Sequence, residues 1–262
     1  MVGIFDSGLG GLSVWREIIK LLPNESTVYV SDSAWCPYGP RPAGEVVERT
    51  KKISRFLINH ECCPIVVACN TASAAAIDAL RDTFATPFVG MEPAVKPAAL
   101  HSHSGVVGVL ATQGTFGGRL YKETSRRFAS QVQVIEQVGE GLVELVEQGL
   151  TDAPQTIELL HKYIDPMIQA GADHIVLGCT HYPFLIPAIE KICNGRIAIV
   201  DPAPAVALQV QKWVNSAPIA PLQPGPLYRF YATGSADALQ AYSRVLCSDA
   251  TSMAFYAHYE IS

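Results

Sequence analysis

Charged residues are scarce in this chain. Asp, Glu, Lys and Arg make up 16% of its 262 residues, hydrophobic residues make up 49%, and the formal net charge is −5. The basic residues are scattered along the sequence, which is not the electrostatic footprint of a nucleic-acid-binding protein. We therefore expect no nucleic-acid partner. The apolar composition indicates a folded protein whose strands are covered by helices on both faces.

Long apolar runs are also missing. No run approaches the roughly 18 residues that a membrane span needs, and residues 1–6 (MVGIFD) lack the basic and apolar regions of a secretory leader. The sequence therefore predicts no membrane association, and we expect a cytoplasmic protein.

The cysteines are not arranged as redox or metal pairs. There are seven, an odd number, with no CxxC pair, which indicates a reducing compartment. The glycine-rich segment 6–11 (DSGLGG) has neither the Lys-Ser/Thr of a P-loop nor the spacing of a dinucleotide-binding turn. Its glycines instead predict a turn whose backbone approaches a ligand closely. His101 and His103 have no third ligand nearby in the sequence and are interpreted as surface-loop residues.

The patterns that are present alternate between strand and helix. Apolar runs predict strands at 2–5, 27–30, 64–68, 87–90, 106–110, 132–135, 174–177, 196–200, 227–231 and 254–256. Helical spacing predicts helices at 12–21, 42–60, 72–80, 142–150, 153–170, 204–214 and 236–245. This alternation is typical of an α/β protein with mostly parallel sheets. The proline-rich segment 216–226 predicts a stiff linker.

Two of the predicted strands end in a cysteine. Segments 66–73 (VVACNTAS) and 176–183 (VLGCTHYP) each pass from an apolar run into a cysteine followed by small polar side chains. Cys69 and Cys179 therefore lie at the carboxyl ends of strands, where open parallel sheets bind ligands. A predicted helix begins just after Cys69, and the positive end of its dipole favours the thiolate.

The two halves of the chain share a layout. Cys179 follows Cys69 by 110 residues. Ser7 and Thr112, which each come just after the first predicted strand of their half, are 105 residues apart. Two nearly equal shifts are the signature of a duplicated unit. We therefore predict two similar doubly wound α/β domains related by a pseudo-two-fold axis, with the active site in the cleft between them. Residues 1–92 and 205–262 would form the domain that carries Cys69, and residues 93–204 the domain that carries Cys179.

Four kinds of site can hold two facing cysteines. A redox pair usually occurs as CxxC, and a zinc site needs about four ligands, of which only Cys69, Cys179 and His181 suggest themselves. A single cysteine nucleophile assisted by His181 would leave Cys69 without a role. Two acid/base groups on opposite faces of one carbon use both thiols, and inversion of a stereocentre requires such a pair. We therefore favour stereoinversion.

Other side chains are suited to binding a small acid. Short uncharged donors occur on the same turns: Ser7, Asn70, Thr71, Thr112, Thr115 and Thr180. His181, two residues after Cys179, is a candidate proton partner. Tyr38 and Gly39 lie in a turn-rich loop suited to placing a phenol or a backbone amide over a ligand. Glu147 lies near a predicted helix end and is interpreted as a solvated carboxylate.

Four blocks of the sequence together resemble the glutamate racemases, a family within the cofactor-independent aspartate/glutamate racemase superfamily. They are residues 5–11 (FDSGLGG), 37–39 (PYG), 68–73 (ACNTAS) and 177–183 (LGCTHYP). Their order and spacing match along essentially the whole chain. The resemblance implies interconversion of L- and D-glutamate without pyridoxal phosphate, another cofactor or a metal. It also implies that the product D-glutamate enters bacterial cell-wall peptidoglycan.

The same resemblance implies roles for individual residues. Cys69 would act on the D-enantiomer and Cys179 on the L-enantiomer. Asp6 would assist Cys69, whereas Glu147 and His181 would assist Cys179. Substrate contacts are implied for Asp6, Ser7, Tyr38, Gly39, Asn70, Thr71, Thr112, Thr115, Thr180 and His181. The partner would be the small-molecule substrate glutamate, and a homodimer is one candidate assembly because family members differ in how their subunits associate.

Two other functions compete with this one. Another two-cysteine racemase or isomerase of the superfamily would act on aspartate, a hydantoin or maleate. A non-catalytic amino-acid-binding module would have the same two-lobed layout, with the thiols merely lining its cleft.

Overall fold

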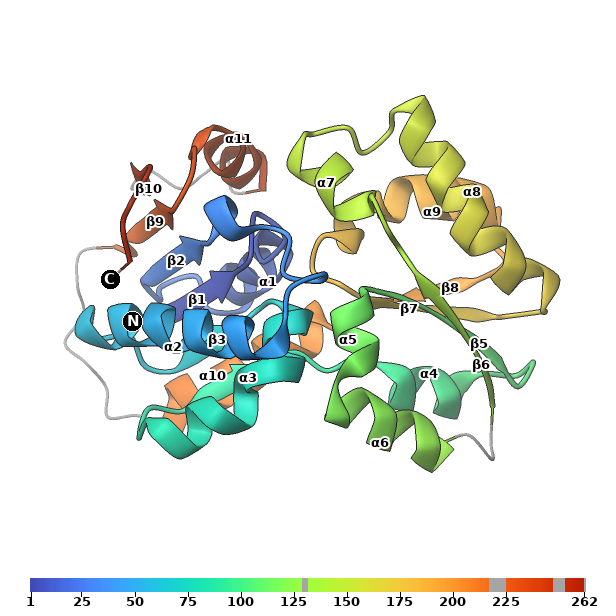
Figure 1. Cartoon of the computed structure of the whole chain (residues 1–262), viewed down its shortest axis with the longest axis horizontal. Helices are drawn as coiled ribbons and strands as arrows, with labels where there is room; N and C mark the ends of the chain where they lie inside the picture. The colour runs from blue at the N-terminus through green and yellow to red at the C-terminus, as the bar shows by residue number, and fades with distance from the viewer. Residues whose placement is uncertain (129–131, 217–224, 247–252, 262) are drawn as a thin grey trace.

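Two lobes lie side by side in the computed structural model, which describes residues 1–128, 132–216, 225–246 and 253–261 (Figure 1). Each lobe is built on one sheet. We call the six-stranded sheet with its helices the first lobe, and the four-stranded sheet with its helices the second lobe. Most of the predicted linker at 216–226 lies outside the described residues.

Both sheets are parallel, and they share a strand order. The first sheet runs β10 (Met253–Tyr256), β9 (Tyr228–Ala232), β2 (Thr27–Ser31), β1 (Val2–Asp6), β3 (Ile65–Val67), β4 (Phe88–Gly90). The second runs β6 (Gln133–Val138), β5 (Val106–Ala111), β7 (His174–Gly178), β8 (Ala198–Val200). The order β2-β1-β3-β4 thus recurs as β6-β5-β7-β8. The prediction of two similar doubly wound α/β halves is confirmed.

Helices cover both sheets. The first lobe holds α1 (Leu12–Leu21), the short 3₁₀ helix η1 (Ser33–Trp35), α2 (Ala43–Asn59), α3 (Asn70–Thr83), α10 (Ala203–Ser216) and α11 (Asp237–Leu246). The second holds α4 (Val95–His101), α5 (Gln113–Gly117), α6 (Arg119–Phe128), α7 (Leu142–Glu147), α8 (Pro154–Gln169), η2 (Tyr182–Leu185) and α9 (Ile186–Cys193). Within the described ranges, no helix has both the length and the apolarity needed to cross a membrane.

The interpretation of His101 as a loop residue is wrong, because His101 is the last residue of α4. Pro97 lies in the first turn of α4, where a backbone N–H has no helical partner and proline is tolerated.

The end of the chain returns to the first lobe. Trp15 on α1 packs edge-on against Tyr228 and Phe230 of β9, with ring centroids 5.5 and 5.2 Å apart, and all three rings are buried. Strand β10 forms the outer edge of the sheet. The domain boundaries at 92 and 204 remain a prediction.

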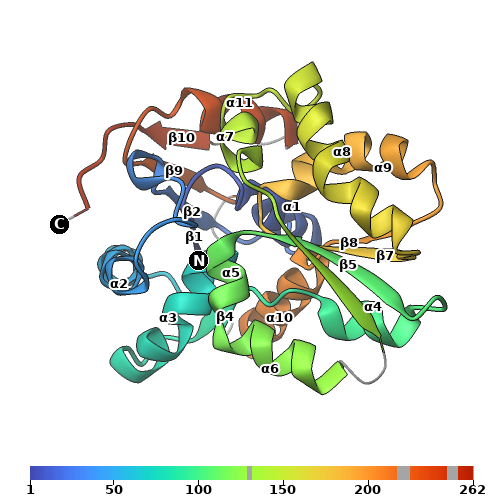
Figure 2. The ribbon, with the colours of Figure 1, turned by 45° about the vertical axis from the view of Figure 1, so that its right-hand side comes forward.

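The central strand of each sheet places the functional turns. Strand β1 is buried along its whole length and lies between β2 and β3. Strand β5 lies in the same way between β6 and β7. The chain therefore leaves each central strand at a switch point, where α/β sheets bind ligands. Helix α5 of the second lobe lies beside α3 of the first, so these ends of the two sheets meet (Figure 2).

Candidate active site

One pocket is lined by both cysteine turns. Its walls are Ser7, Pro37, Tyr38, Gly39, Cys69, Asn70 and Thr71 from the first lobe and Thr112, Val143, Cys179, Thr180 and His181 from the second. Cys69 lies between β3 and α3, and Cys179 directly follows β7. The structure therefore brings the two thiols to one pocket from opposite lobes.

Cys69 is the N-cap of α3. Its Sγ accepts a hydrogen bond from the Ala72 N–H at 3.5 Å and donates one to Ser7 Oγ at 3.7 Å. Burial, followed by the charge of Asp6, raises the pKa of the Cys69 thiol to about 12. The bond from the helix N-terminus lowers this pKa, as the sequence predicted, but burial outweighs it. The helix N-terminus therefore favours the Cys69 thiolate in the expected direction, but burial and Asp6 favour the thiol more strongly.

Asp6 links the two cysteine turns. Its carboxylate is fully buried and accepts hydrogen bonds from the Gly8 N–H and from Thr180 Oγ1, both at 3.0 Å. The bond from Thr180 crosses from the second lobe to the first. Burial raises the pKa of Asp6 above its ordinary value, although His181 and these two donors lower it.

The buried His181 and the half-buried Glu147 form an ion pair beside Cys179. His181 Nδ1 lies 3.8 Å from Cys179 Sγ, and Nε2 lies 2.6 Å from Glu147 Oε1, which also accepts the Leu9 N–H at 2.7 Å. Burial lowers the pKa of His181, but Cys179, Cys36 and Glu147 together raise it well above its ordinary value. Burial raises the pKa of Glu147, and His181 with the Leu9 N–H brings it below the ordinary value. The interpretation of Glu147 as a solvated carboxylate is wrong.

The glycines of segment 6–11 leave room for this ion pair. A Cβ on Gly10 would stand 2.3 Å from His181 Nδ1, and a Cβ on Gly8 would stand 1.9 Å from Glu147 Oε1. The sequence predicted that this turn approaches a ligand. In the structure its glycines approach the second lobe's ion pair.

Three threonines form a chain across the pocket. Thr71 Oγ1 of the first lobe and Thr112 Oγ1 of the second are 2.9 Å apart, and Thr112 Oγ1 is 2.9 Å from Thr115 Oγ1. Thr115 donates to the Gly178 carbonyl at 3.3 Å and is not part of the pocket wall. Thr115 therefore lies behind Thr112.

Asn70 carries a polar group without a partner. Its side chain is 3% exposed and lines the pocket, and neither Nδ2 nor Oδ1 has a hydrogen-bond partner among the described residues. Leaving a buried polar group unpaired costs about 1–3 kcal/mol. Such a cost in a pocket wall indicates a site for a polar ligand.

Tyr38 belongs to a network that holds its loop. Its hydroxyl donates to Asp32 Oδ2 at 2.6 Å, and Arg49 binds both oxygens of the Asp32 carboxylate at 2.7 and 2.8 Å. The phenol hydroxyl is therefore committed to Asp32. This network fixes the loop that carries Gly39 into the pocket wall.

Comparison with known proteins decides the family. A family model described as Asp/Glu/Hydantoin racemase matches residues 3–210, well over half of the chain. The chain belongs to this racemase family. Glutamate racemase of Ectopseudomonas mendocina is 46% identical over 241 residues, which are 92% of each chain.

Solved glutamate racemases share the whole fold. That of Bacillus anthracis has a TM-score of 0.86 at 30% identity, covering 98% of this chain and 96% of its own. That of Escherichia coli, solved with L-glutamate and the activator UDP-MurNAc-ala, has a TM-score of 0.84 at 30% identity and covers 98% of each chain. The predicted fold class and the suspected family are confirmed.

Sequence reasoning missed two features of this racemase-family site. Cys36 lies close to the Glu147–His181 pair, and Asp32 with Arg49 holds the Tyr38 loop. Neither feature has a local sequence signal, because each depends on contacts between segments far apart in the chain.

Proposed function

We propose that this racemase interconverts L- and D-glutamate with Cys69 and Cys179 as its two acid/base groups. The observation that carries the proposal is the delivery of two buried thiols to one pocket by equivalent turns of two lobes with the same strand order. The glutamate racemases among its relatives support glutamate as the substrate. The E. coli relative, solved with L-glutamate bound, supports it further.

The reaction moves one proton off Cα and another on. A thiolate on one face removes the α proton and becomes a thiol, and the electron pair of the broken C–H bond is delocalised into the adjacent carboxylate. The thiol on the other face then donates its proton to Cα and becomes a thiolate. By the family resemblance, Cys69 removes the proton of D-glutamate and Cys179 that of L-glutamate. Each turnover leaves the enzyme ready for the reverse reaction.

Neighbouring charges differ between the two thiols. His181 Nδ1 stands 3.8 Å from Cys179 Sγ, and the pKa of His181 is raised well above its ordinary value, so an imidazolium cation lies beside this cysteine. Cys69 has the buried Asp6 nearby and a pKa raised to about 12 in this structure. With Cα between the thiols, the substrate ammonium group attached to it brings a positive charge near Cys69, and this charge lowers the pKa of that thiol. Proton removal at Cys69 is thereby coupled to substrate binding.

Uncharged donors hold the substrate. The unpaired Asn70 amide offers both a donor and an acceptor, and the hydroxyls of Ser7, Thr71 and Thr112 line the same pocket. Thr180 Oγ1 is engaged with Asp6, so we assign it the positioning of that carboxylate. Together these groups bind a dicarboxylic amino acid without adding charge beside the reacting thiols.

In the cell, we place the enzyme in the cytoplasm of a bacterium, supplying D-glutamate for cell-wall peptidoglycan and hence for cell shape. The six cysteines of the described ranges are all free, which suits a reducing compartment. A homodimer remains a prediction.

Solvent isotope exchange tests the mechanism. The enzyme is incubated with L- or D-glutamate in D₂O, and both deuterium at Cα and optical rotation are followed. We expect wild-type enzyme to incorporate deuterium from either side, and Cys69→Ser and Cys179→Ser each to lose at least about 100-fold in racemisation rate. Cys63→Ser changes an exposed cysteine outside the pocket wall and serves as the control.

The variants also separate the competing functions. Cys69→Ser should lose exchange from D-glutamate more severely than from L-glutamate, with the opposite bias in Cys179→Ser. Full activity in either variant would overturn the two-thiol mechanism. Aspartate assayed in parallel distinguishes a different racemase of the superfamily, and a binding module would exchange no deuterium.

A further inference from the structure

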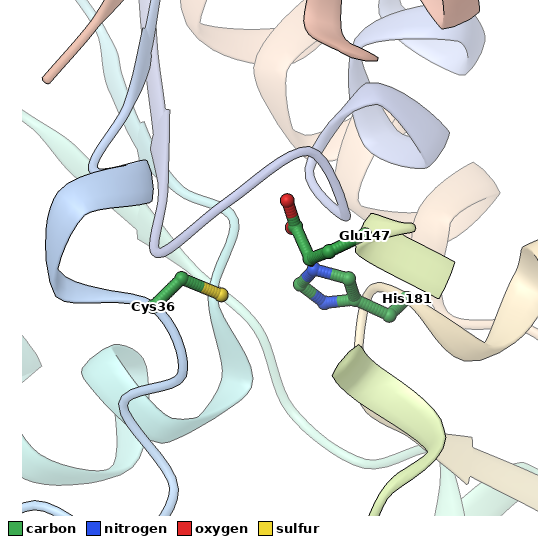
Figure 3. Close-up of side chains that lie close together, drawn as sticks. All are labelled: Cys36, Glu147 and His181. Atoms are coloured by element: carbon green, nitrogen blue, oxygen red, sulfur yellow. The ribbon is translucent and has the colours of Figure 1, made fainter. Parts of the chain in front are cut away.

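Cys36, Glu147 and His181 converge beside the pocket. Cys36 follows η1 in the first lobe, Glu147 ends α7, and His181 follows β7 in the second lobe. One ligand atom from each residue, a thiol sulfur, a carboxylate oxygen and an imidazole nitrogen, lies within 4.8 Å of the other two. Figure 3 shows the Cys36 sulfur pointing toward the imidazole of His181, with Glu147 beside that ring. In the racemisation proposed above, Cys36 is neither an acid/base group nor a substrate contact.

We propose that these three residues bind one zinc-class divalent cation. Thiolate, imidazole and carboxylate are the donors that Zn²⁺ takes in proteins, and three protein ligands leave the fourth tetrahedral position open for water. Zinc–ligand bonds of about 2.0–2.3 Å imply ligand atoms about 3.4 Å apart in a tetrahedral site. Binding therefore requires Cys36 Sγ to approach the other two side chains, and Glu147 Oε1 to move away from His181 Nε2, which lies 2.6 Å from it, so that the ion can enter between them.

Charge favours a dication at this centre. A Cys36 thiolate and the Glu147 carboxylate supply two negative charges, and a neutral His181 supplies a lone pair. On binding, the thiol proton and one imidazolium proton leave to solvent, and the cation takes their place. The Leu9 N–H holds the Glu147 carboxylate beside the buried His181, so these two ligands are already neighbours and only their mutual hydrogen bond has to open.

The consequence is inhibition. Coordination converts the His181 cation beside Cys179 into a metal ligand, and it removes Glu147 from its present pairing. Cys36 belongs to the first lobe and the other two ligands to the second, so one ion ties together the lobes that form the pocket walls. The zinc form is therefore expected to be inactive. Inhibition rests on the proposed racemisation, whereas binding does not.

A competing zinc site would use the pocket thiols Cys69 and Cys179 together with His181. The site proposed here shares His181 with it but takes its other two ligands from Cys36 and Glu147. Cys36→Ala removes the thiolate ligand unique to the cluster and leaves the pocket thiols in place. This variant therefore distinguishes the two sites.

Cobalt spectroscopy tests the site without relying on activity. Co²⁺ is titrated into wild type, Cys36→Ala and Cys63→Ala, the last removing an exposed cysteine outside the cluster. We expect one equivalent to give a thiolate-to-cobalt charge-transfer band in wild type and Cys63→Ala, and none in Cys36→Ala. Zn²⁺ should displace the Co²⁺, and its affinity, measured by chelator competition, should fall at least 100-fold in Cys36→Ala.

Racemisation assays then test the consequence. We expect Zn²⁺ to inhibit wild type and Cys63→Ala at least 10-fold, reversibly by EDTA, while the rate of Cys36→Ala, compared with its own rate without metal, is unchanged by Zn²⁺. A band or an inhibition that persists unchanged in Cys36→Ala would overturn the proposal. If no variant racemises glutamate but the band still depends on Cys36, the metal site stands and the proposed function fails.

Discussion

At the scale of single residues, the Asn70 side chain is placed for substrate binding at a cost to the stability of the free enzyme. It is buried in the pocket wall with neither amide atom paired among the described residues. A residue that served the fold alone would be expected to satisfy these atoms, because most buried polar groups in native proteins are hydrogen-bonded. Asn70 is therefore expected to lower the stability of the free enzyme and to gain its partners from the substrate.

Replacing Asn70 with alanine should weaken binding without weakening the fold. We expect Asn70→Ala to raise KM for glutamate at least 10-fold, because the substrate loses an amide contact of about 1.5 kcal/mol or more. The free energy of unfolding without substrate should stay the same or rise by up to about 1 kcal/mol, because an unpaired buried amide is removed. Steady-state kinetics and urea denaturation measure the two effects.

Thr50 offers a matched control for Asn70. It is also fully buried with an unpaired hydroxyl, but it lies on α2 and not in the pocket wall. Thr50→Val should change stability in the same direction and leave KM unchanged. Loss of several kcal/mol in Asn70→Ala, with unchanged KM, would show that the amide supports the fold instead.

At the scale of elements, the turn after β1 and the ion pair of the second lobe depend on each other. Gly10 lies so close to His181 that a Cβ there would stand 2.3 Å from Nδ1. The imidazole is buried and held by Glu147, so it cannot move aside freely. The glycine is required by a contact between lobes.

Gly10→Ala should therefore damage both the site and the fold. We expect the free energy of unfolding to fall by about 1–3 kcal/mol through overpacking. The racemisation rate should fall at least 10-fold, because His181 shifts relative to Cys179. A Cβ on Gly44, in the first turn of α2, meets nothing within 4 Å, so Gly44→Ala should keep full activity and stability. Equal behaviour of the two variants in kinetics and denaturation would contradict the steric argument.

The elements also show what the sequence could predict. Helices with several turns of apolar periodicity matched closely, as with 12–21 against α1 and 42–60 against α2. Helices α4, α5 and α9 were not predicted, because 5 to 8 residues give few turns in which a period can emerge. Helix α6 was missed because most of its 10 residues are charged or polar and give little apolar periodicity. The cysteines at strand ends were placed correctly, because a strand that ends in polar residues is a local signal. The proximity of Cys36 to Glu147 and His181 had no local signal, because it arises only where the two lobes pack together.

At the scale of the whole molecule, the duplication explains why one pocket holds two similar thiols. Each lobe repeats the same strand order, and each places a cysteine after the third strand of its series. The first lobe differs in having two extra strands, β9 and β10, from the end of the chain. These strands extend the sheet on the side of β2, whereas Cys69 follows β3 on the other side of β1.

The returning strands should matter for stability and not for chemistry. Phe230 on β9 is fully buried and packs against Trp15 and Phe255, with ring centroids 5.2 and 4.9 Å apart. We expect Phe230→Ala to lower the free energy of unfolding by about 3–5 kcal/mol, because it leaves a cavity in this aromatic core. Val245 on α11 is 83% exposed, and Val245→Ala should change that free energy by no more than about 0.5 kcal/mol.

The kinetics of Phe230→Ala are measured at low temperature, where the destabilised variant remains folded. Phe230 is not in the pocket wall, so the variant should keep the wild-type kcat and KM wherever it remains folded. Its activity should disappear over the same urea range as its circular dichroism signal. Loss of kcat in fully folded Phe230→Ala would mean that the end of the chain acts on the pocket through the sheet, and that the first lobe works as one mechanical unit from β10 to β4.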